Sequence, residues 1–202
     1  MPMNRAHRTL CGSHEWAAFT RRRLLPWALE GVGLGEDVLE VGPGYGANLR
    51  VLVERVSRLT ALEIDGATAR RLERDWGTRA LIVHGDATAA PLPDAGFSAV
   101  VCFTMLHHVP TVVLQDRLLA EAYRMLRPGG VFAGSDSQLT LPFRLLHLGD
   151  TMNVVCPRIS GSGSPRPAST RPSWSGTTAV TSFASARTRH SGGGKGAARA
   201  TR

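Results

Sequence analysis

Cysteines, apolar runs of membrane-spanning length and acidic residues near the C-terminal end are all scarce in this chain of 202 residues. The three cysteines, Cys11, Cys102 and Cys156, are far apart and match no metal-ligand spacing, so neither a disulfide framework nor a zinc site is expected. The first residues contain no apolar segment of the signal-peptide type, and no later run approaches the ~18 apolar residues of a membrane span. We therefore expect a cytoplasmic protein with reduced cysteines and no membrane partner.

The net positive charge of the chain comes from its C-terminal part. The sequence has 24 basic and 16 acidic residues, a net charge of +8. Residues 151–202 contain eight Lys or Arg and no Asp or Glu, so residues 1–150 are neutral overall. Enzymes that act on nucleic acids usually carry a basic stripe beside the site. The neutral body therefore argues against a nucleic-acid partner and against a non-catalytic protein that works through its basic tail.

Short apolar runs alternate with helix-length segments through the body of the chain. The runs have the length of buried strands and lie at residues 37–41, 59–64, 80–84, 98–103 and 130–135. Helical patterns occupy residues 48–56, 67–76 and 114–126 between them. Such alternation predicts an α/β fold, a doubly wound and mostly parallel sheet with helices on both faces. Ligands bind such sheets at the carboxyl ends of the central strands, where the strand order reverses.

The stretch "VLEVGPGYGANL" places a glycine-rich loop directly after the first predicted strand. A dinucleotide-binding loop has the spacing G-x-G-x-x-G, whereas Gly42, Gly44 and Gly46 are each two residues apart. Pro43 also lacks an N–H that a pyrophosphate could use, and the carboxylate of Glu40 would repel a diphosphate. An acidic loop with bare glycine backbone suits a cationic ligand instead, and S-adenosylmethionine, with its ammonium and sulfonium groups, is such a ligand.

The pattern E-x-G-x-G-x-G after a first strand resembles motif I of the class I S-adenosylmethionine-dependent methyltransferases. The resemblance spans about residues 35–137 and implies a Rossmann-like fold with S-adenosylmethionine as the cofactor. It also implies that the cofactor loop consists of Glu40, Gly42, Gly44 and Gly46. The alternative that stays open at this point is an NAD-type oxidoreductase.

Two further strand ends resemble landmarks of the same family. "LEID" ends the second strand, and Glu63 matches the acidic residue that accepts both ribose hydroxyls, whereas Asp65 stands where a helix N-cap would. "HGDAT" ends the third strand, where Asp86 matches the residue that binds the adenine amino group and Ala87 would offer its backbone N–H to the ring. The other interpretation of Asp86 is that it caps a turn.

The fourth strand ends in "FTMLHH", which resembles the family's segment beside the sulfonium. The resemblance implies that Phe103 and Thr104 border the cofactor and the incoming acceptor. His107 and His108 invite assignment as a general base, but adjacent side chains point to different sides of a turn. We therefore expect at most one of them to face the site, and the sequence assigns no catalytic residue.

The cofactor already supplies an electrophilic methyl group, so the protein has mainly to align an acceptor in line with the S–CH3 bond and exclude water. No metal is implied. We expect residues 35–154 to form the S-adenosylmethionine-binding domain and residues 1–34 a helical cover that helps to choose a small-molecule acceptor. Arg144, His147 and Asp150 are candidates for the cover as well, or else for its solvated face. The oligomeric state is not predicted.

From about residue 155 the chain consists mainly of Ser, Thr, Gly, Pro, Arg and Ala, a composition that predicts a disordered basic tail over residues 155–202. The family usually ends with one more helix and an antiparallel strand pair, and both are expected to be missing here. Such a composition is typical of a GC-rich gene translated out of frame, so a frameshift that leaves an impaired, methyltransferase-like chain is one hypothesis. A genuine basic tail is the other.

Overall fold

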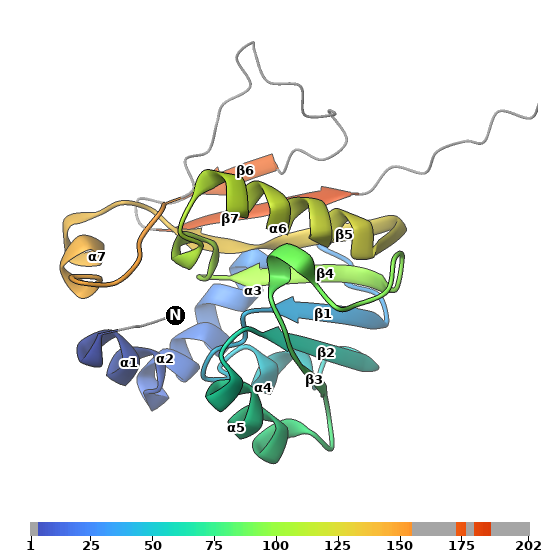
Figure 1. The fold of residues 1–202 in the computed structure, drawn as a ribbon, viewed down its shortest axis with the longest axis horizontal. Coiled ribbons are helices and arrows are strands. Elements are labelled where there is room, and N and C mark those ends of the chain that lie inside the picture. The colour runs from blue at the N-terminus through green and yellow to red at the C-terminus, as the bar shows by residue number, and fades with distance from the viewer. Residues whose placement is uncertain (1–3, 155–172, 177–179, 187–202) are drawn as a thin grey trace, which may run out of the picture.

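The computed structural model describes residues 4–154, 173–176 and 180–186 (Figure 1). The strands are β1 (Asp37–Val41), β2 (Arg58–Glu63), β3 (Leu81–His84), β4 (Phe97–Phe103), β5 (Leu126–Ser137), β6 (Ser173–Gly176) and β7 (Val180–Ala186). They form one sheet in the order β3-β2-β1-β4-β5-β7-β6. The first five strands in this order pair in parallel, as the alternation of apolar runs and helical segments predicted.

The order of the strands reverses beside β1. The chain passes from β1 to β2 and β3 on one side, and then returns to place β4 on the other side of β1. β1 is buried along its length, which explains why it is an apolar run with two exceptions, Asp37 at its start and Glu40. The carboxyl ends of β1, β2 and β4 therefore meet at a switch point, the place where sheets of this type bind ligands.

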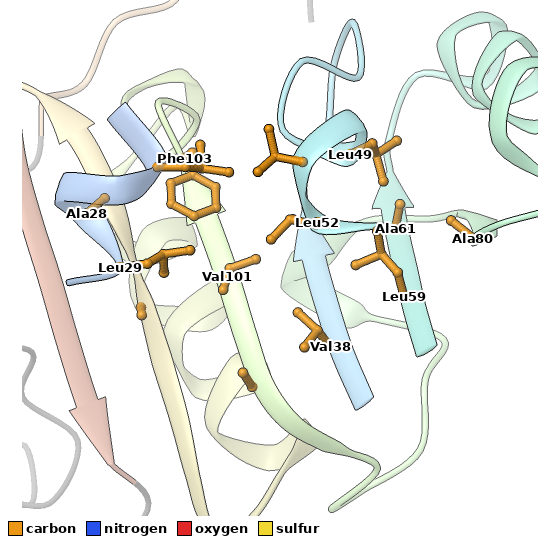
Figure 2. Packing of buried hydrophobic residues seen from close by; sticks show 14 of the residues in the cluster. Ala28, Leu29, Val38, Leu49, Leu52, Leu59, Ala61, Ala80, Val101 and Phe103 are labelled. Atoms are coloured by element: carbon orange, nitrogen blue, oxygen red, sulfur yellow. The ribbon is translucent and has the colours of Figure 1, made fainter. Parts of the chain in front are cut away.

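Alternating side chains of the central strands build two separate cores. Val38, Ala99 and Val101 belong to the core on one face, whereas Leu39 and Val100 belong to the core on the other. This period of two follows from the pleat of the strands. Figure 2 shows the first of these cores, in which strand side chains point toward the helices that precede and follow β1.

Short helices cover the first core, and one long helix covers the second. The helices are α1 (Arg5–Cys11), α2 (His14–Phe19), the π-helical turn η1 (Thr20–Leu24), α3 (Leu25–Ala28), α4 (Leu49–Leu52), α5 (Gly66–Trp76), the 3-10 turns η2 (Ala87–Ala89) and η3 (Leu106–His108), α6 (Val112–Met125) and α7 (Leu141–Leu146).

The helix α4 is shorter than the helical segment predicted at residues 48–56. Pro26 lies in the first turn of α3, which directly continues the π-helical turn η1. None of the described helices is both long and apolar enough to cross a membrane.

The prediction that the final strand pair is missing is wrong. β7 pairs antiparallel with β5 from Val131↔Ala186 to Ser137↔Val180, and β6 pairs antiparallel with β7. The tail is therefore not disordered throughout, and the edge of β5 is covered. Ladder pairing uses backbone groups, and the β-branched and aromatic residues of "VTSFASA" favour it despite the scarcity of aliphatic residues. The other predictions for the tail concern residues outside the described ranges.

Gly134 of β5 lies directly against the backbone of Cys102 in β4, and its replacement should lower the stability of the chain. A Cβ atom on Gly134 would overlap with the backbone carbonyl of Cys102 on the paired strand, and no side-chain rotation relieves that overlap. We expect Gly134→Ala to lower the free energy of unfolding by roughly 2 kcal/mol or more, measured by thermal or urea unfolding. Gly33→Ala is the matched control, because a Cβ there meets no described atom within 4 Å. Equal stability of the two variants would contradict the described register.

Candidate active site

A cavity of about 1080 Å³ lies at the carboxyl ends of the parallel strands. Its floor comes from the segments that follow β1, β2, β3 and β4, and its cover comes from α1, α2 and α7. In Figure 1 these three helices lie together at that end of the sheet. Most residues predicted to bind the cofactor line the cavity: Gly42, Gly44, Glu63, Asp86, Ala87, Phe103 and Thr104. Glu40, which precedes the glycine loop, and Gly46, the last glycine of the loop, do not line it.

The glycine loop is held by Glu63 from the neighbouring strand. Gly42, Gly44 and Gly46 have φ values of 68°, 53° and 79°, a left-handed conformation that favours glycine. One oxygen of Glu63 accepts a hydrogen bond from the Gly44 N–H at 3.2 Å, and the other accepts from the Asp65 N–H at 2.9 Å. Glu63 thus joins the ends of β1 and β2 and places its carboxylate at the cavity wall. Asp65 caps α5, as predicted, by accepting from the Thr68 N–H at 2.7 Å.

Glu40 is a fully buried carboxyl group beneath the loop. Its Oε1 accepts a hydrogen bond from Asn48 Nδ2 at 2.8 Å, whereas Oε2 has no partner among the described residues. The pKa of Glu40 is raised to about 8: burial is the largest cause, the hydrogen bond from Asn48 opposes it, and the nearby charge of Glu63 adds to it. The folded chain therefore keeps Glu40 mainly protonated at neutral pH. An approaching cation would favour its ionised form.

Asp86 adopts the structural role that the sequence left open. It is exposed, and its Oδ1 accepts a hydrogen bond from the Thr88 N–H at 2.8 Å, which caps the turn η2. Asp86 and Ala87 nevertheless both line the cavity, beyond the end of β3. The cap fixes the backbone of this segment, so the Ala87 N–H and the Asp86 carboxylate have a defined place at the wall.

The end of β4 carries an unusual backbone conformation. Thr104 has a φ of 48°, which is rare for a β-branched residue, and its N–H donates to the Ser135 carbonyl at 2.7 Å. Strained backbone of this kind clusters at functional sites. The bend turns the chain from β4 into η3 and brings Phe103, Thr104 and the following residues to one wall of the cavity.

Both His107 and His108 line the cavity, so the expectation that at most one would do so is wrong. Both residues belong to the turn η3. His107 Nδ1 lies 2.5 Å from Asp136 Oδ1, and the His107 N–H donates to Asp136 Oδ2 at 2.9 Å. Its Nε2 is buried without a partner among the described residues. Burial is the largest cause of a His108 pKa lowered to about 3.

The cover is tied together by Asp150, which sequence reasoning left undecided. Its carboxylate accepts from the Asn4 N–H at 2.6 Å and lies 2.8 Å from His7 Nδ1. His147 is also buried and lines the cavity, whereas Arg144 is exposed. Sequence reasoning missed His7 altogether, because nothing in its neighbourhood marks a contact with a residue 143 positions later.

Comparison with known proteins agrees with this geometry. Residues 39–134 match the family model described as a methyltransferase domain. The matched segment contains the glycine loop and the carboxyl ends of β1, β2, β3 and β4, so this part of the chain is similar to S-adenosylmethionine-dependent methyltransferases. The chain is 37% identical over 98 residues to a Mycolicibacterium smegmatis protein named "Probable S-adenosylmethionine-dependent methyltransferase". The aligned residues cover 48% of this chain and 37% of that protein.

Other relatives carry the names of different acceptors. The chain is 33% identical over 112 residues to the 27-O-demethylrifamycin SV methyltransferase of Amycolatopsis mediterranei, covering 50% of this chain and 39% of that protein. It is 36% identical over 81 residues to the ribosomal RNA small subunit methyltransferase A of Thiobacillus denitrificans, covering 40% of this chain and 32% of that protein. The chain thus spans less than half the length of these methyltransferases, and the expectation against a nucleic-acid acceptor gains no support from them.

A solved structure supports the fold over more of the chain. A methyltransferase of Methanosarcina mazei superposes with a TM-score of 0.56 at 13% identity and covers 79% of this chain and 95% of that one. At this identity the likeness concerns the fold alone. The methyltransferase fold expected from motif I is confirmed.

Glu40 gives the site a characteristic pH dependence. The folded-state pKa of about 8 lies above the ordinary glutamate value of 4.5, so between these pH values the folded chain binds a proton that the unfolded chain releases. The stability that this proton contributes is fully present below about pH 4.5 and is lost as the pH rises through about 8. We expect the melting temperature to fall over this window by several degrees more in the wild-type chain than in Glu40→Gln. If the melting temperatures of the wild-type chain and Glu40→Gln changed equally from pH 5 to 9, the raised pKa of Glu40 would be contradicted.

Proposed function

We propose that the cavity binds S-adenosylmethionine and that the chain transfers its methyl group to a small molecule. The observation that carries the proposal is the glycine loop at the switch point, held against Glu63 and followed by an open cavity of about 1080 Å³. This volume lies at the upper end of the range of small-molecule sites. The match to the methyltransferase domain supports the same conclusion.

The residues present fit this cofactor. A Cβ atom on Gly44 meets no described atom within 4 Å, so the loop leaves open space where the ligand would lie. Glu63 would hold the ribose hydroxyls, Asp86 and Ala87 the adenine, and the loop from Gly42 to Gly44 the amino-acid part. Glu40, with one buried oxygen unpaired, would balance the positive charge from behind the loop. The cofactor supplies an electrophilic methyl group when bound.

The chain's own part in the reaction is orientation and exclusion of water. Phe103 and Thr104, at the strained end of β4, would border the reacting centre, and the unpaired Nε2 of His107 offers a hydrogen-bond acceptor there. Asp136 fixes the ring of His107. Trp16, Phe19 and Phe143 from the cover line the same cavity and would keep water out.

A small, partly apolar acceptor suits this cover better than a polynucleotide. The aromatic residues close the cavity from two sides, and a relative named for 27-O-demethylrifamycin SV shows that such an acceptor occurs among similar proteins. An NAD-type oxidoreductase is less well supported, because Pro43 lacks the N–H that a pyrophosphate needs and the family match is to methyltransferases. The impaired-chain alternative loses one argument, because the strand pair beside β5 is present.

Cofactor binding is tested by a pair of glycine variants with the same backbone strain. Gly44 and Gly31 have φ values of 53° and 70°, and a Cβ on either meets no described atom within 4 Å. Gly44 lines the cavity and Gly31 does not. We expect Gly44→Ala to weaken S-adenosylhomocysteine binding at least tenfold in calorimetric titration, and Gly31→Ala to leave it unchanged. Tighter binding of NAD than of S-adenosylhomocysteine, or an equal loss of affinity in Gly44→Ala and Gly31→Ala, would contradict the proposal.

The class of acceptor is tested by following a labelled methyl group. The purified chain is incubated with methyl-tritiated S-adenosylmethionine and either a low-molecular-weight extract or total RNA. We expect label to appear in the small-molecule fraction and to resist nuclease treatment, because the covered cavity admits a small acceptor. Transfer of label to RNA alone would replace the small-molecule acceptor with a nucleic acid while leaving the cofactor assignment intact.

A further inference from the structure

Three histidines from distant parts of the chain converge on one wall of the cavity. His7 belongs to α1, His108 to the turn η3, and His147 caps the end of α7. One ligand atom from each lies within 4.8 Å of the others. The ring centroid of His7 lies 4.2 Å from the ring centroid of His147 and 5.2 Å from the ring centroid of His108. His7 and His147 are buried, at 5% and 4% exposure.

Each of these rings is oriented by an oxygen-bearing partner on its other side. His7 Nδ1 lies 2.8 Å from Asp150 Oδ2, and His147 Nδ1 lies 2.8 Å from the Phe143 carbonyl oxygen. His108 hydrogen-bonds the Thr151 backbone. Histidines that bind metals almost always donate their second ring N–H to a carboxylate or a carbonyl in this way.

The hydrogen bonds decide which nitrogen is available. A carbonyl oxygen only accepts, so Nδ1 of His147 must carry the hydrogen, and Nε2 of the neutral ring then carries a lone pair. That Nε2 is buried and has no partner among the described residues. An unpaired buried polar atom is costly, so packing of the ring on Phe143 does not by itself account for its place. The carboxylate of Asp150 also only accepts, so Nδ1 of His7 carries the hydrogen and Nε2 of the neutral His7 ring carries a lone pair.

We propose that His7, His108 and His147 bind one divalent transition-metal ion of the zinc type. Imidazole nitrogens suit zinc, and zinc–nitrogen distances of about 2.0–2.1 Å put tetrahedral ligand atoms ~3.4 Å apart. Because the three ligand atoms now lie within 4.8 Å of one another, metal binding requires the rings to approach by about an ångström. Three histidines leave a fourth coordination position, and because all three rings line the cavity this position opens onto it.

The ion would fasten the cover to the body of the chain. His7 lies on the N-terminal helix, His147 follows β5, and His108 lies on the floor of the cavity, so one ion would link all three. The sequence predicted no zinc site because of the spacing of its cysteines. That prediction did not consider a site made of histidines. The proposal concerns metal binding alone and stands or falls separately from methyl transfer.

Calorimetric titration of the full, tag-free chain with zinc chloride tests the site. We expect saturation at one equivalent, a loss of affinity of at least 100-fold in His7→Ala and in His147→Ala, and a loss of about 10- to 100-fold in Asp150→Asn. His14→Ala is the control, because His14 is exposed and does not line the cavity. No saturable binding, or equal losses in His14→Ala and His147→Ala, would overturn the proposal.

Cobalt absorption provides a measurement that does not depend on the folding of variants. The wild-type chain loaded with one equivalent of Co²⁺ should show the visible bands of a tetrahedral nitrogen and oxygen site. Cys11 also lines the cavity, and a thiolate ligand would add an intense near-ultraviolet band. We expect that band to be absent, because Cys11 is not a member of the cluster whose ligand atoms lie within 4.8 Å of one another. Its presence, or an octahedral spectrum, would contradict the three-histidine site.

Discussion

The reversal of strand order beside β1 is the constraint on which the rest of the molecule depends. Because β2 and β4 flank β1 in the sheet, the segments that follow them diverge to opposite faces and leave a crevice at the switch point. The glycine loop, the end of β2 and the strained end of β4 all open onto this crevice. β1 is buried along its length and pairs with β2 on one side and β4 on the other, so the site is built at the centre of the sheet.

A buried carboxylate organises each half of the cavity. Glu63 accepts from two backbone N–H groups and binds the glycine loop to the second strand, while Asp150 accepts from Asn4 and contacts His7 to bind the N-terminal helix to the segment after β5. Each carboxylate joins elements that are unrelated in sequence. Loss of either would therefore alter the shape of the cavity as well as its charge.

The sequence predicted the parts that depend on local pattern. Apolar runs located the strands of the parallel sheet, and the spacing after β2 identified Asp65 as a helix cap. The glycine loop and its neighbours could be assigned to one cavity because parallel strand ends share an edge. β6 and β7 escaped prediction because their pairing rests on backbone groups, which a composition of Ser, Thr and Ala does not reveal.

The cover could not be predicted for a different reason. His7, His108 and His147 meet only because three segments fold over the same cavity, and no spacing in the sequence relates them. The position of Asp136 beneath His107 is also a product of the fold, since it depends on the pairing of β4 with β5. Long-range contacts of this kind carry no periodic signal.

A crystal structure of the chain with S-adenosylhomocysteine tests whether the crevice at the switch point is an S-adenosylmethionine site. We expect the adenine beside Asp86 and Ala87, the ribose hydroxyls on Glu63, and the sulfur beside Phe103 and Thr104. A ligand bound elsewhere on the chain, or a crevice that remains empty at saturating concentrations of ligand, would contradict it.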